Sequence, residues 1–501
     1  MTKTHKSLLF LLIAVLLSMG LLFACEEEPK KPGISEGEET TVVPGGEEMD
    51  LVFEDGAVYC IKTDQLMGIG GSLFGTSGGE AAEVRGYAGD LDQLFRFEKT
   101  DAGFKIVNLS TGLYLAARKG DGDGAAACLS VDKDIFPNVW TITKTDNGYT
   151  IMNNSTGGYL APEDPEVTSV LRQKTDAAKA TEWQIVKEAG SDVVFPKILS
   201  LSGDWIGESS CPAIIKADGM YYNYNQVGRI RIKASPDLVN WAKAGIVLAP
   251  EKPSWIKQEI GADGVWAPHV WHYKDEYRVY YAGSSSGSQN SVIGLSVGKS
   301  PTGPFTDMGM VIRSYKGDDY NCIDPRVYEE NGDAYLVFGS YWKGIYMRKL
   351  DCETGKLDEG DPTLWHLAKG NGEMEAASII KKDGYYYLFV AMGNLRKNAT
   401  YYLAVGRSES LFGPYVDKRG RPMLEGYTSR LTEWKDGVQG AAHGEIFLDD
   451  DGTYYFVSEF WKDRSEASPT VSLLITSLVW NDDGWPVTAL ASDLLREMKL
   501  K

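Results

Sequence analysis

The sequence predicts an all-β protein with at least two domains. Its 501 residues exceed what one hydrophobic core normally serves. The 27 Tyr, 13 Trp and 55 Gly favour many short strands joined by tight turns over long helices. Two unrelated repeats divide the chain, one across residues 51–190 and the other across residues 198–495.

The N-terminus has the layout of an export signal. Lys3 and Lys6 precede an apolar run over residues 8–24, which is followed by Cys25. The ending Leu22-Phe23-Ala24-Cys25 resembles a bacterial lipobox, which implies that residues 1–25 are a lipoprotein signal and that a lipid on Cys25 anchors the protein to a membrane. A plain secretory signal with a chance cysteine is the alternative.

Residues 26–50 are rich in Glu, Pro and Gly and are predicted to form a disordered acidic tether. The run Glu26-Glu27-Glu28 is similar to the surface-export signal of Bacteroidetes lipoproteins, which implies a position in the cell envelope at the outer-membrane surface. Ordinary linker charge would explain the same three residues.

Charge and cysteine content exclude several classes of function. A formal charge of -19 argues against nucleic acid as a partner, because nucleic-acid binders usually carry a basic surface, so a neutral ligand is more plausible. The six cysteines are too scattered for a disulfide framework or a zinc site with paired ligands.

We expect the protein to act as a monomer.

The first repeat has a period of 45 residues, because residues 103–116 match residues 148–161. A degenerate copy of the same repeat begins near Tyr59. The units close on Gln93-Leu94-Phe95, on Asn138-Val139-Trp140 and on Thr181-Glu182-Trp183. These endings resemble the Gln-x-Trp signature of ricin-type β-trefoil lectins, which implies that residues 51–190 form one trefoil. The repeat establishes architecture, so sugar binding and a role as a spacer both stay open.

The second repeat couples an apolar strand to a tight turn and a Tyr-rich strand, the pattern of a β-hairpin. Five copies predict the five blades of a β-propeller. Aligning them places five residues at one equivalent position near the central axis: Cys211, Ala267, Asp324, Ala376 and His443. Glu375 comes one residue before Ala376. The sequence therefore predicts that Asp324, Glu375 and His443 meet in one channel, either as a functional site or as a hydrogen-bonded plug.

Residues 200–490 contain several motifs in a fixed order: Val265-Trp266-Ala267-Pro268, Asn321-Cys322-Ile323-Asp324-Pro325, Val337-Phe338-Gly339-Ser340-Tyr341-Trp342, Glu375-Ala376, Val405-Gly406-Arg407-Ser408, Ala442-His443-Gly444 and Gly484-Trp485-Pro486. Together these motifs resemble glycoside hydrolase family 43, most of all its arabinan-cleaving members.

The resemblance implies hydrolysis with inversion, in which a carboxylic acid protonates the leaving oxygen while a carboxylate activates water from the opposite face. It assigns the general acid to Glu375 and the carboxylate that tunes and orients it to Asp324. It places calcium at His443, although a hydrogen bond in the channel would also explain that histidine. Trp266, Trp342 and Arg407 are expected to contact substrate, with core packing as the alternative for the tryptophans.

The chain departs from the family in the first blade, where Cys211 stands in place of the aspartate that acts as general base. A thiol is mostly protonated at neutral pH, and neighbouring carboxylates disfavour the thiolate further. Glu208, Asp204 or a substrate group could supply the base instead.

Two functions therefore stay open. One is a surface glycosidase acting on arabinan or a related plant cell-wall polysaccharide, of the endo-1,5-α-L-arabinosidase or the α-L-arabinofuranosidase/β-xylosidase type. The other is a catalytically impaired carbohydrate-binding lipoprotein. A third class, an adhesin that uses only the trefoil, is also compatible with the sequence.

Overall fold

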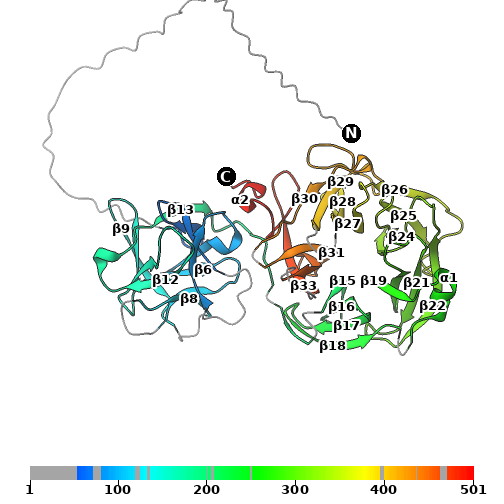
Figure 1. Ribbon diagram of the computed structural model, residues 1–501, viewed down its shortest axis with the longest axis horizontal. Helices are drawn as coiled ribbons and strands as arrows, with labels where there is room; N and C mark the ends of the chain where they lie inside the picture. Colours follow the sequence, from blue (N-terminus) through cyan, green and yellow to red (C-terminus); the bar gives the residue numbers. More distant parts are fainter. Residues whose placement is uncertain are drawn as a thin grey trace, which may run out of the picture. The chain divides into compact units, whose positions relative to one another are not determined.

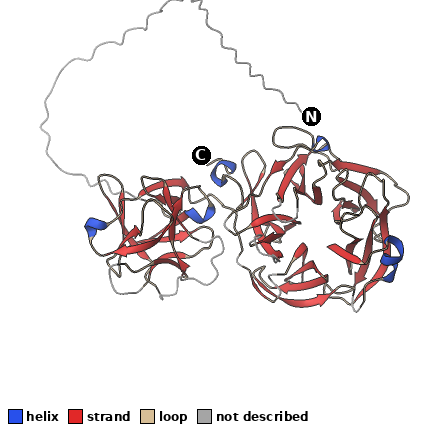
Figure 2. Cartoon of the chain, viewed as in Figure 1, coloured by secondary structure: helices blue, strands red, loops and turns tan. Residues whose placement is uncertain are grey.

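The computed structural model describes residues 53–71, 80–118, 124–131, 136–199, 201–204, 208–248, 251–394, 400–435, 437–462 and 471–500. The predicted signal, Cys25 and the predicted tether lie outside these residues. Within the described ranges the regular elements are strands, apart from two short α-helices and three 3-10 helices (Figure 2). No helix in these ranges is long and apolar enough to cross a membrane.

The strands between residues 58 and 189 form one 13-stranded sheet system, which makes the first domain (Figure 1). They are β1 (Val58–Lys62), β2 (Met67–Gly70), β3 (Glu80–Ala81), β4 (Glu83–Gly86), β5 (Leu94–Thr100), β6 (Gly103–Asn108), β7 (Tyr114–Ala117), β8 (Ala127–Ser130), β9 (Val139–Lys144), β10 (Tyr149–Asn153), β11 (Tyr159–Pro162), β12 (Ser169–Lys174) and β13 (Gln184–Ala189).

The aromatic residue that closes each repeat of this domain is a core residue. Phe95, Trp140 and Trp183 are fully buried in one hydrophobic cluster. The indole N–H of Trp140 donates to the carbonyl of Leu115 at 2.7 Å, and that of Trp183 donates to the carbonyl of Leu160 at 3.1 Å. Buried indoles need such partners, so the repeat signature is explained by packing and hydrogen bonding.

The second domain consists of five sheets, as the five sequence copies predict, and their strands pair antiparallel apart from one short parallel pair in the first blade. The blades are β15 (Ser210–Ala217), β16 (Met220–Val227), β17 (Arg229–Ser235) and β18 (Asn240–Ile246) with the short β14 (Ser202–Gly203); β19 (Gly264–Tyr273), β20 (Glu276–Ser284), β21 (Ser291–Gly298) and β22 (Phe305–Ser314); β23 (Arg326–Glu330), β24 (Asp333–Phe338), β25 (Ile345–Leu350) and β26 (Leu364–Ala368); β27 (Met374–Lys382), β28 (Tyr385–Met392), β29 (Tyr402–Ser408) and β30 (Ser429–Arg430); β31 (Gln439–Leu448), β32 (Tyr454–Trp461), β33 (Val471–Trp480) and β34 (Pro486–Thr488). Helix α1 (Ser254–Ile260) precedes the second blade, and α2 (Leu494–Glu497) follows the fifth.

Four of the five predicted hairpins have two-residue turns. Asp218, Lys274, Asn331 and Asp383 adopt positive φ in them, the conformation that such turns require and that Asn and Asp tolerate best. The fifth turn is longer than predicted, because residues 449–453 separate β31 from β32. Asp449 in that loop accepts hydrogen bonds from Lys216 and Tyr221 of the first blade, both at 2.6 Å. The longer loop therefore connects the last blade to the first.

The blades close into a ring (Figure 1). The first strand of each blade is an edge strand of its sheet, and these strands contact one another in the cyclic order β15, β19, β23, β27 and β31. The ring is sealed by residues 197–199, which pair with β33 through the Ile198 and Thr476 bridge.

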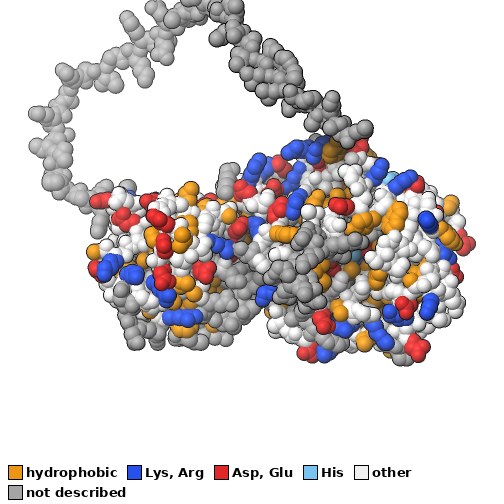
Figure 3. Space-filling view, viewed as in Figure 1, with side chains coloured by type: hydrophobic (Ala, Val, Ile, Leu, Met, Phe, Trp, Pro, Cys, Tyr) orange, Lys and Arg blue, Asp and Glu red, His pale blue; other side chains and the backbone are white. Residues whose placement is uncertain are grey.

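Acidic and basic side chains are interspersed over the face shown in Figure 3.

A buried arginine joins four of the five blades at the axis. Arg326, which is 3% exposed, donates through one terminal nitrogen to the carbonyls of Pro325 and Pro268, at 2.9 and 3.1 Å. Its other terminal nitrogen donates to the carbonyls of Pro212 and Gly444, at 3.2 and 3.5 Å. Each of these carbonyls belongs to the residue directly after a predicted axial residue. The guanidinium therefore fixes the positions of those axial residues relative to one another.

We expect Arg326→Met to destabilise the propeller, because it leaves four buried carbonyls without this donor and each unpaired buried group costs about 1–3 kcal/mol. A net loss of about 3 kcal/mol corresponds to a fall of roughly 6–12 °C in the thermal midpoint. Differential scanning calorimetry measures this, with Arg419→Met at an exposed site as the control. A midpoint within about 2 °C of the wild type would show that Arg326 does not hold the blades together.

Candidate functional site

The five predicted axial residues share one unusual backbone conformation. All have a positive φ between 38° and 55°: Cys211, Ala267, Asp324, Ala376 and His443. This conformation costs a non-glycine residue about 1–2 kcal/mol, and such strain gathers at functional sites. In four blades the strand register also shifts at this position. The equivalence predicted from the repeats is therefore confirmed by the backbone itself.

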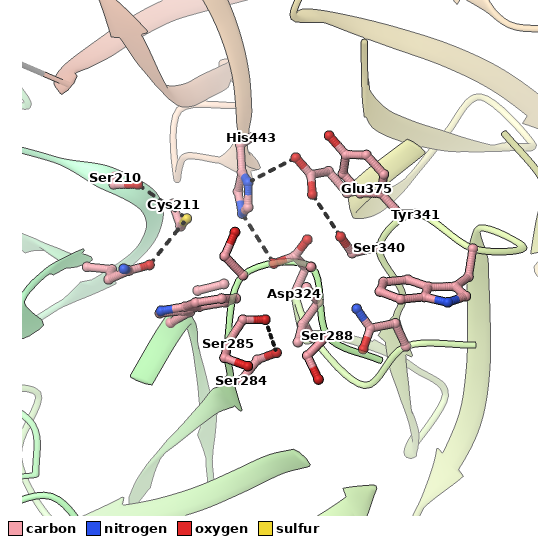
Figure 4. Close-up of a pocket in the computed structure, with 18 of the residues that line it drawn as sticks. Ser210, Cys211, Ser284, Ser285, Ser288, Asp324, Ser340, Tyr341, Glu375 and His443 are labelled. Atoms are coloured by element: carbon pink, nitrogen blue, oxygen red, sulfur yellow. Dashed lines mark hydrogen bonds and ion pairs between the residues drawn. The ribbon is translucent and has the colours of Figure 1, made fainter. Parts of the chain in front are cut away.

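Four of the five axial residues, all but Ala376, border a cavity of about 900 Å³ (Figure 4). Cys211, Asp324, Glu375 and His443 all line it. Most of the remaining lining residues are aromatic or small and polar: Trp266, Trp342, Tyr341, Ser284, Ser285, Ser286, Ser288, Ser340, Asn321, Asn394, Gln226 and Ser210. Ala267, Ile323 and two glycines complete the lining. Aromatic faces and uncharged hydrogen-bonding groups suit a neutral, hydroxyl-rich ligand.

Glu375 is buried and held by two hydroxyl groups. Tyr401 donates to its Oε1 at 2.6 Å, and Ser340 donates to its Oε2 at 2.8 Å. Burial raises the pKa of Glu375, while the hydrogen bonds from Tyr401 and Ser340 oppose that rise. The carboxyl group is thus fixed in orientation and keeps its proton to a higher pH than it would in water.

Asp324 is buried in the same cavity, at 3% exposure. Burial raises its pKa well above the ordinary value, and the charge of Glu375 raises it further, while Arg326 and the backbone N–H of Ala376 act in the opposite direction. Burial therefore favours the neutral carboxyl form at Asp324 as it does at Glu375.

His443 lies beside both Asp324 and Glu375 (Figure 4). Its Nε2 is 3.6 Å from an oxygen of Asp324, and its Nδ1 is 4.0 Å from Oε1 of Glu375 and 3.2 Å from the hydroxyl of Tyr401. Burial, aided by the charge of Arg326, lowers the pKa of His443 to about 3. The imidazole is therefore neutral in the pH range in which a glycosidase works.

The same three residues could hold a metal ion. One ligand atom from each of Asp324, Glu375 and His443 lies within 4.8 Å of the others. Oδ2 of Asp324 and Nε2 of His443 are buried and have no hydrogen-bond partner within the described part of the chain. Such orphaned acceptors fit a cation or ordered water at this point.

Cys211 lies on the other side of His443 from Glu375 (Figure 4). Burial raises the pKa of its thiol well above the ordinary value, and the negative charges of Glu459 and Asp324 raise it further. The thiol donates weakly to Gln226, with an S···O distance of 3.8 Å. Cys211 is therefore a neutral thiol and does not supply the missing base.

Two other predicted residues lie away from the cavity. Glu208 is exposed, and its carboxylate pairs with Arg231 instead of facing the cavity. Arg407 packs over the rings of Tyr385 and Trp485, 4.3 and 4.4 Å from their centroids, and does not line the cavity. Neither the predicted alternative base nor the predicted arginine contact with substrate is available in this arrangement.

The structure adds site residues that the sequence did not single out. Tyr401 immediately precedes β29, and no repeat spacing marks it. Glu459 lies in β32, an otherwise mostly apolar strand. A single charged residue in such a strand is the sequence feature that could have marked Glu459 as a candidate. Ser340 belongs to a motif already noted for its aromatic neighbours.

Comparisons with known proteins agree with this site. The profile of glycosyl hydrolases family 43 matches residues 206–486, and a ricin-type beta-trefoil lectin domain-like profile matches residues 91–164. The extracellular endo-alpha-(1->5)-L-arabinanase 1 of Bacillus subtilis is 34% identical over 291 residues, which cover 55% of this chain and 86% of that protein.

Two further relatives are also named as arabinan-degrading enzymes. The extracellular exo-alpha-(1->5)-L-arabinofuranosidase ArbA of Cellvibrio japonicus is 32% identical over 299 residues, covering 55% of this chain and 84% of that protein. The alpha-L-arabinanase of Cellvibrio cellulosa, solved in complex with arabinohexaose, aligns with a TM-score of 0.53 at 30% identity, covering 57% of this chain and 98% of that one. The chain therefore belongs to glycosyl hydrolases family 43, as an arabinanase-like five-bladed β-propeller preceded by a ricin-type lectin-like β domain.

Proposed function

We propose that this protein hydrolyses arabinan or a related arabinose-containing polysaccharide, with inversion at the anomeric carbon. The observation that carries the proposal is the buried group of Glu375, Asp324 and His443 at the wall of a cavity lined with neutral polar and aromatic side chains. Relatives named as endo- and exo-acting arabinan-degrading enzymes support arabinose as the sugar.

Glu375 is the general acid in this proposal. Burial raises its pKa and so favours the protonated form, and the hydroxyl groups of Tyr401 and Ser340 hold the carboxyl group in one orientation. It gives its proton to the oxygen of the leaving sugar as the bond to the anomeric carbon breaks. The family resemblance assigns Asp324 the role of orienting and tuning this acid, and its buried carboxyl group lines the same cavity.

The cavity supports a polysaccharide segment as the substrate. A volume of about 900 Å³ lies at the upper end of the range for ligand sites. Trp342 is 37% exposed and lines the cavity, so its ring is available to pack on the C–H face of a sugar. The complex of a related arabinanase with arabinohexaose supports an oligosaccharide as the occupant.

The residues present also fit the calcium ion predicted from the family resemblance. Calcium takes six to eight oxygen ligands, so Asp324 and water would supply oxygens while His443 would bind through nitrogen or through water. Bound there, the ion would supply positive charge that favours the ionised form of Asp324.

A second candidate function is the binding of the same polysaccharide without hydrolysis. One observation favours it: Cys211, at the position of the family base, is a buried neutral thiol. Loss of a positioned base typically lowers the rate by about 10² to 10⁴.

We expect Glu375→Gln to lower the release of reducing sugar from arabinan by about 10² to 10⁴, because the amide cannot protonate the leaving oxygen. The control is Glu373→Gln, two residues away at an exposed position that does not line the cavity, which leaves the rate unchanged. Wild-type protein that binds arabinan in calorimetry but releases no sugar from arabinans, arabinoxylans or arabinogalactans would favour the binding function.

We expect Tyr401→Phe to move the alkaline limb of the kcat profile to higher pH. Its hydroxyl stabilises the ionised form of Glu375, so its removal raises the pKa of Glu375, and the acid stays protonated to a higher pH. A hydrogen bond to a charged group corresponds to a shift of about one pH unit. Tyr402→Phe, at the next position, leaves the limb in place. A limb that shifts to lower pH in Tyr401→Phe would exclude Glu375 as the group that must be protonated.

A further inference from the structure

An exposed aromatic residue, Tyr315, lies at the cavity end of the second blade. Strands β20 and β22 run in the same direction, because both pair antiparallel with β21 between them. β20 ends at Ser284, which lines the cavity, so β22 also ends on that side, and Tyr315 directly follows its last residue. At 56% exposure, Tyr315 is the most exposed aromatic residue in the described ranges.

Short contacts connect the backbone at Tyr315 to the cavity wall. The hydroxyl of the preceding residue, Ser314, donates to the carbonyl of Gln289 at 2.7 Å and lies 3.5 Å from the side-chain oxygen of Asn321. Asn321 lines the cavity, and Gln289 directly follows the lining residue Ser288. Tyr315 is therefore held beside the wall of the cavity, although it is not part of the lining itself.

The ring of Tyr315 lies on a fixed guanidinium group. The guanidinium carbon of Arg313 is 4.2 Å from the centre of the ring. Arg313 donates to the carboxylate and to the carbonyl of Glu259, and at 3.0 Å to the side-chain oxygen of Asn290. A cation held by three acceptors thus supports one face of the ring, while more than half of the residue stays exposed. A ring fixed in advance loses less conformational entropy when a ligand packs on its open side.

The rim around Tyr315 suits a sugar chain that leaves the cavity. Trp342, which lines the cavity, is connected to the same loop, because the neighbouring Lys343 pairs with Asp319 at 2.5 Å. Ser288 and the serines before it add uncharged hydroxyl groups to this side of the wall. A polysaccharide is longer than the cavity, so its chain must cross the rim. An exposed aromatic ring at that point can pack on the C–H face of a sugar.

We propose that Tyr315 forms an outer subsite for the arabinan chain, beyond the sugars that lie in the cavity. Its ring packs on one sugar of a long substrate and increases the affinity, and it takes no part in bond cleavage. Substrates short enough to lie wholly within the cavity do not reach it. The inference rests on the hydrolysis of arabinan proposed above, and it adds a preference for the polymer over short oligosaccharides.

Michaelis constants for substrates of different length test this subsite in the purified full chain. We expect Tyr315→Ala to raise KM for linear 1,5-α-L-arabinan by about 3- to 10-fold, since contact with an aromatic ring contributes affinity of this order. Its kcat and its KM for arabinotriose should stay at the wild-type values. Tyr315→Phe should keep the wild-type KM for arabinan, because the ring remains.

The control is Phe412→Ala. Phe412 is another exposed aromatic residue, but it follows β29 at the opposite end of the blades from the cavity. Its removal should leave both Michaelis constants unchanged.

An unchanged KM for arabinan in Tyr315→Ala would overturn the proposal. An equal rise in KM for arabinotriose would overturn it as well, because the substitution would then act on the cavity itself. Both outcomes leave the hydrolytic function intact. If the wild type binds arabinan in calorimetry but releases no sugar, hydrolysis is contradicted, and weaker binding by Tyr315→Ala would still support the subsite while equal binding would overturn it. Wild-type protein that neither binds nor hydrolyses arabinan would contradict both proposals.

Discussion

The hydrogen bonds of one buried guanidinium hold the site together. Arg326 binds the carbonyls that follow four of the five strained axial residues, so the positions of Cys211, Asp324 and His443 depend on it. A propeller brings residues that are distant in sequence to one axis, but a ring of sheets does not by itself fix their distances. The arginine supplies that constraint. Its charge also opposes the rise that burial causes in the pKa of Asp324, and it adds to the fall that burial causes in the pKa of His443.

The electrostatics of the site combine the burial of its carboxyl groups with the positive charge of Arg326. Asp324, Glu375 and Glu459 are all buried, and burial favours the neutral form of a carboxyl group. Hydroxyl groups from Tyr401, Ser340 and Ser210 compensate part of that cost. Protons are therefore shared among a few fixed groups, which is the condition that acid and base catalysis requires.

Much of this arrangement could be predicted from the sequence, because it repeats. The five axial positions, the two-residue turns and the convergence of Asp324, Glu375 and His443 follow from copies at equivalent offsets. Tyr401 and Glu459 occupy positions that are not repeated, and their contacts form only when different strands or blades meet. Glu208 shows the converse: three residues from Cys211 in sequence, it points to Arg231 because nearness along the chain does not set the direction of a side chain.

The most direct test of the account is the Cys211→Asp variant, which restores the carboxylate that the family resemblance places at the base position. The account predicts that kcat on arabino-oligosaccharides rises by about 10² to 10⁴, because a positioned base contributes a factor of this size while Glu375 is already in place as the acid. A kcat within about threefold of the wild type would contradict it.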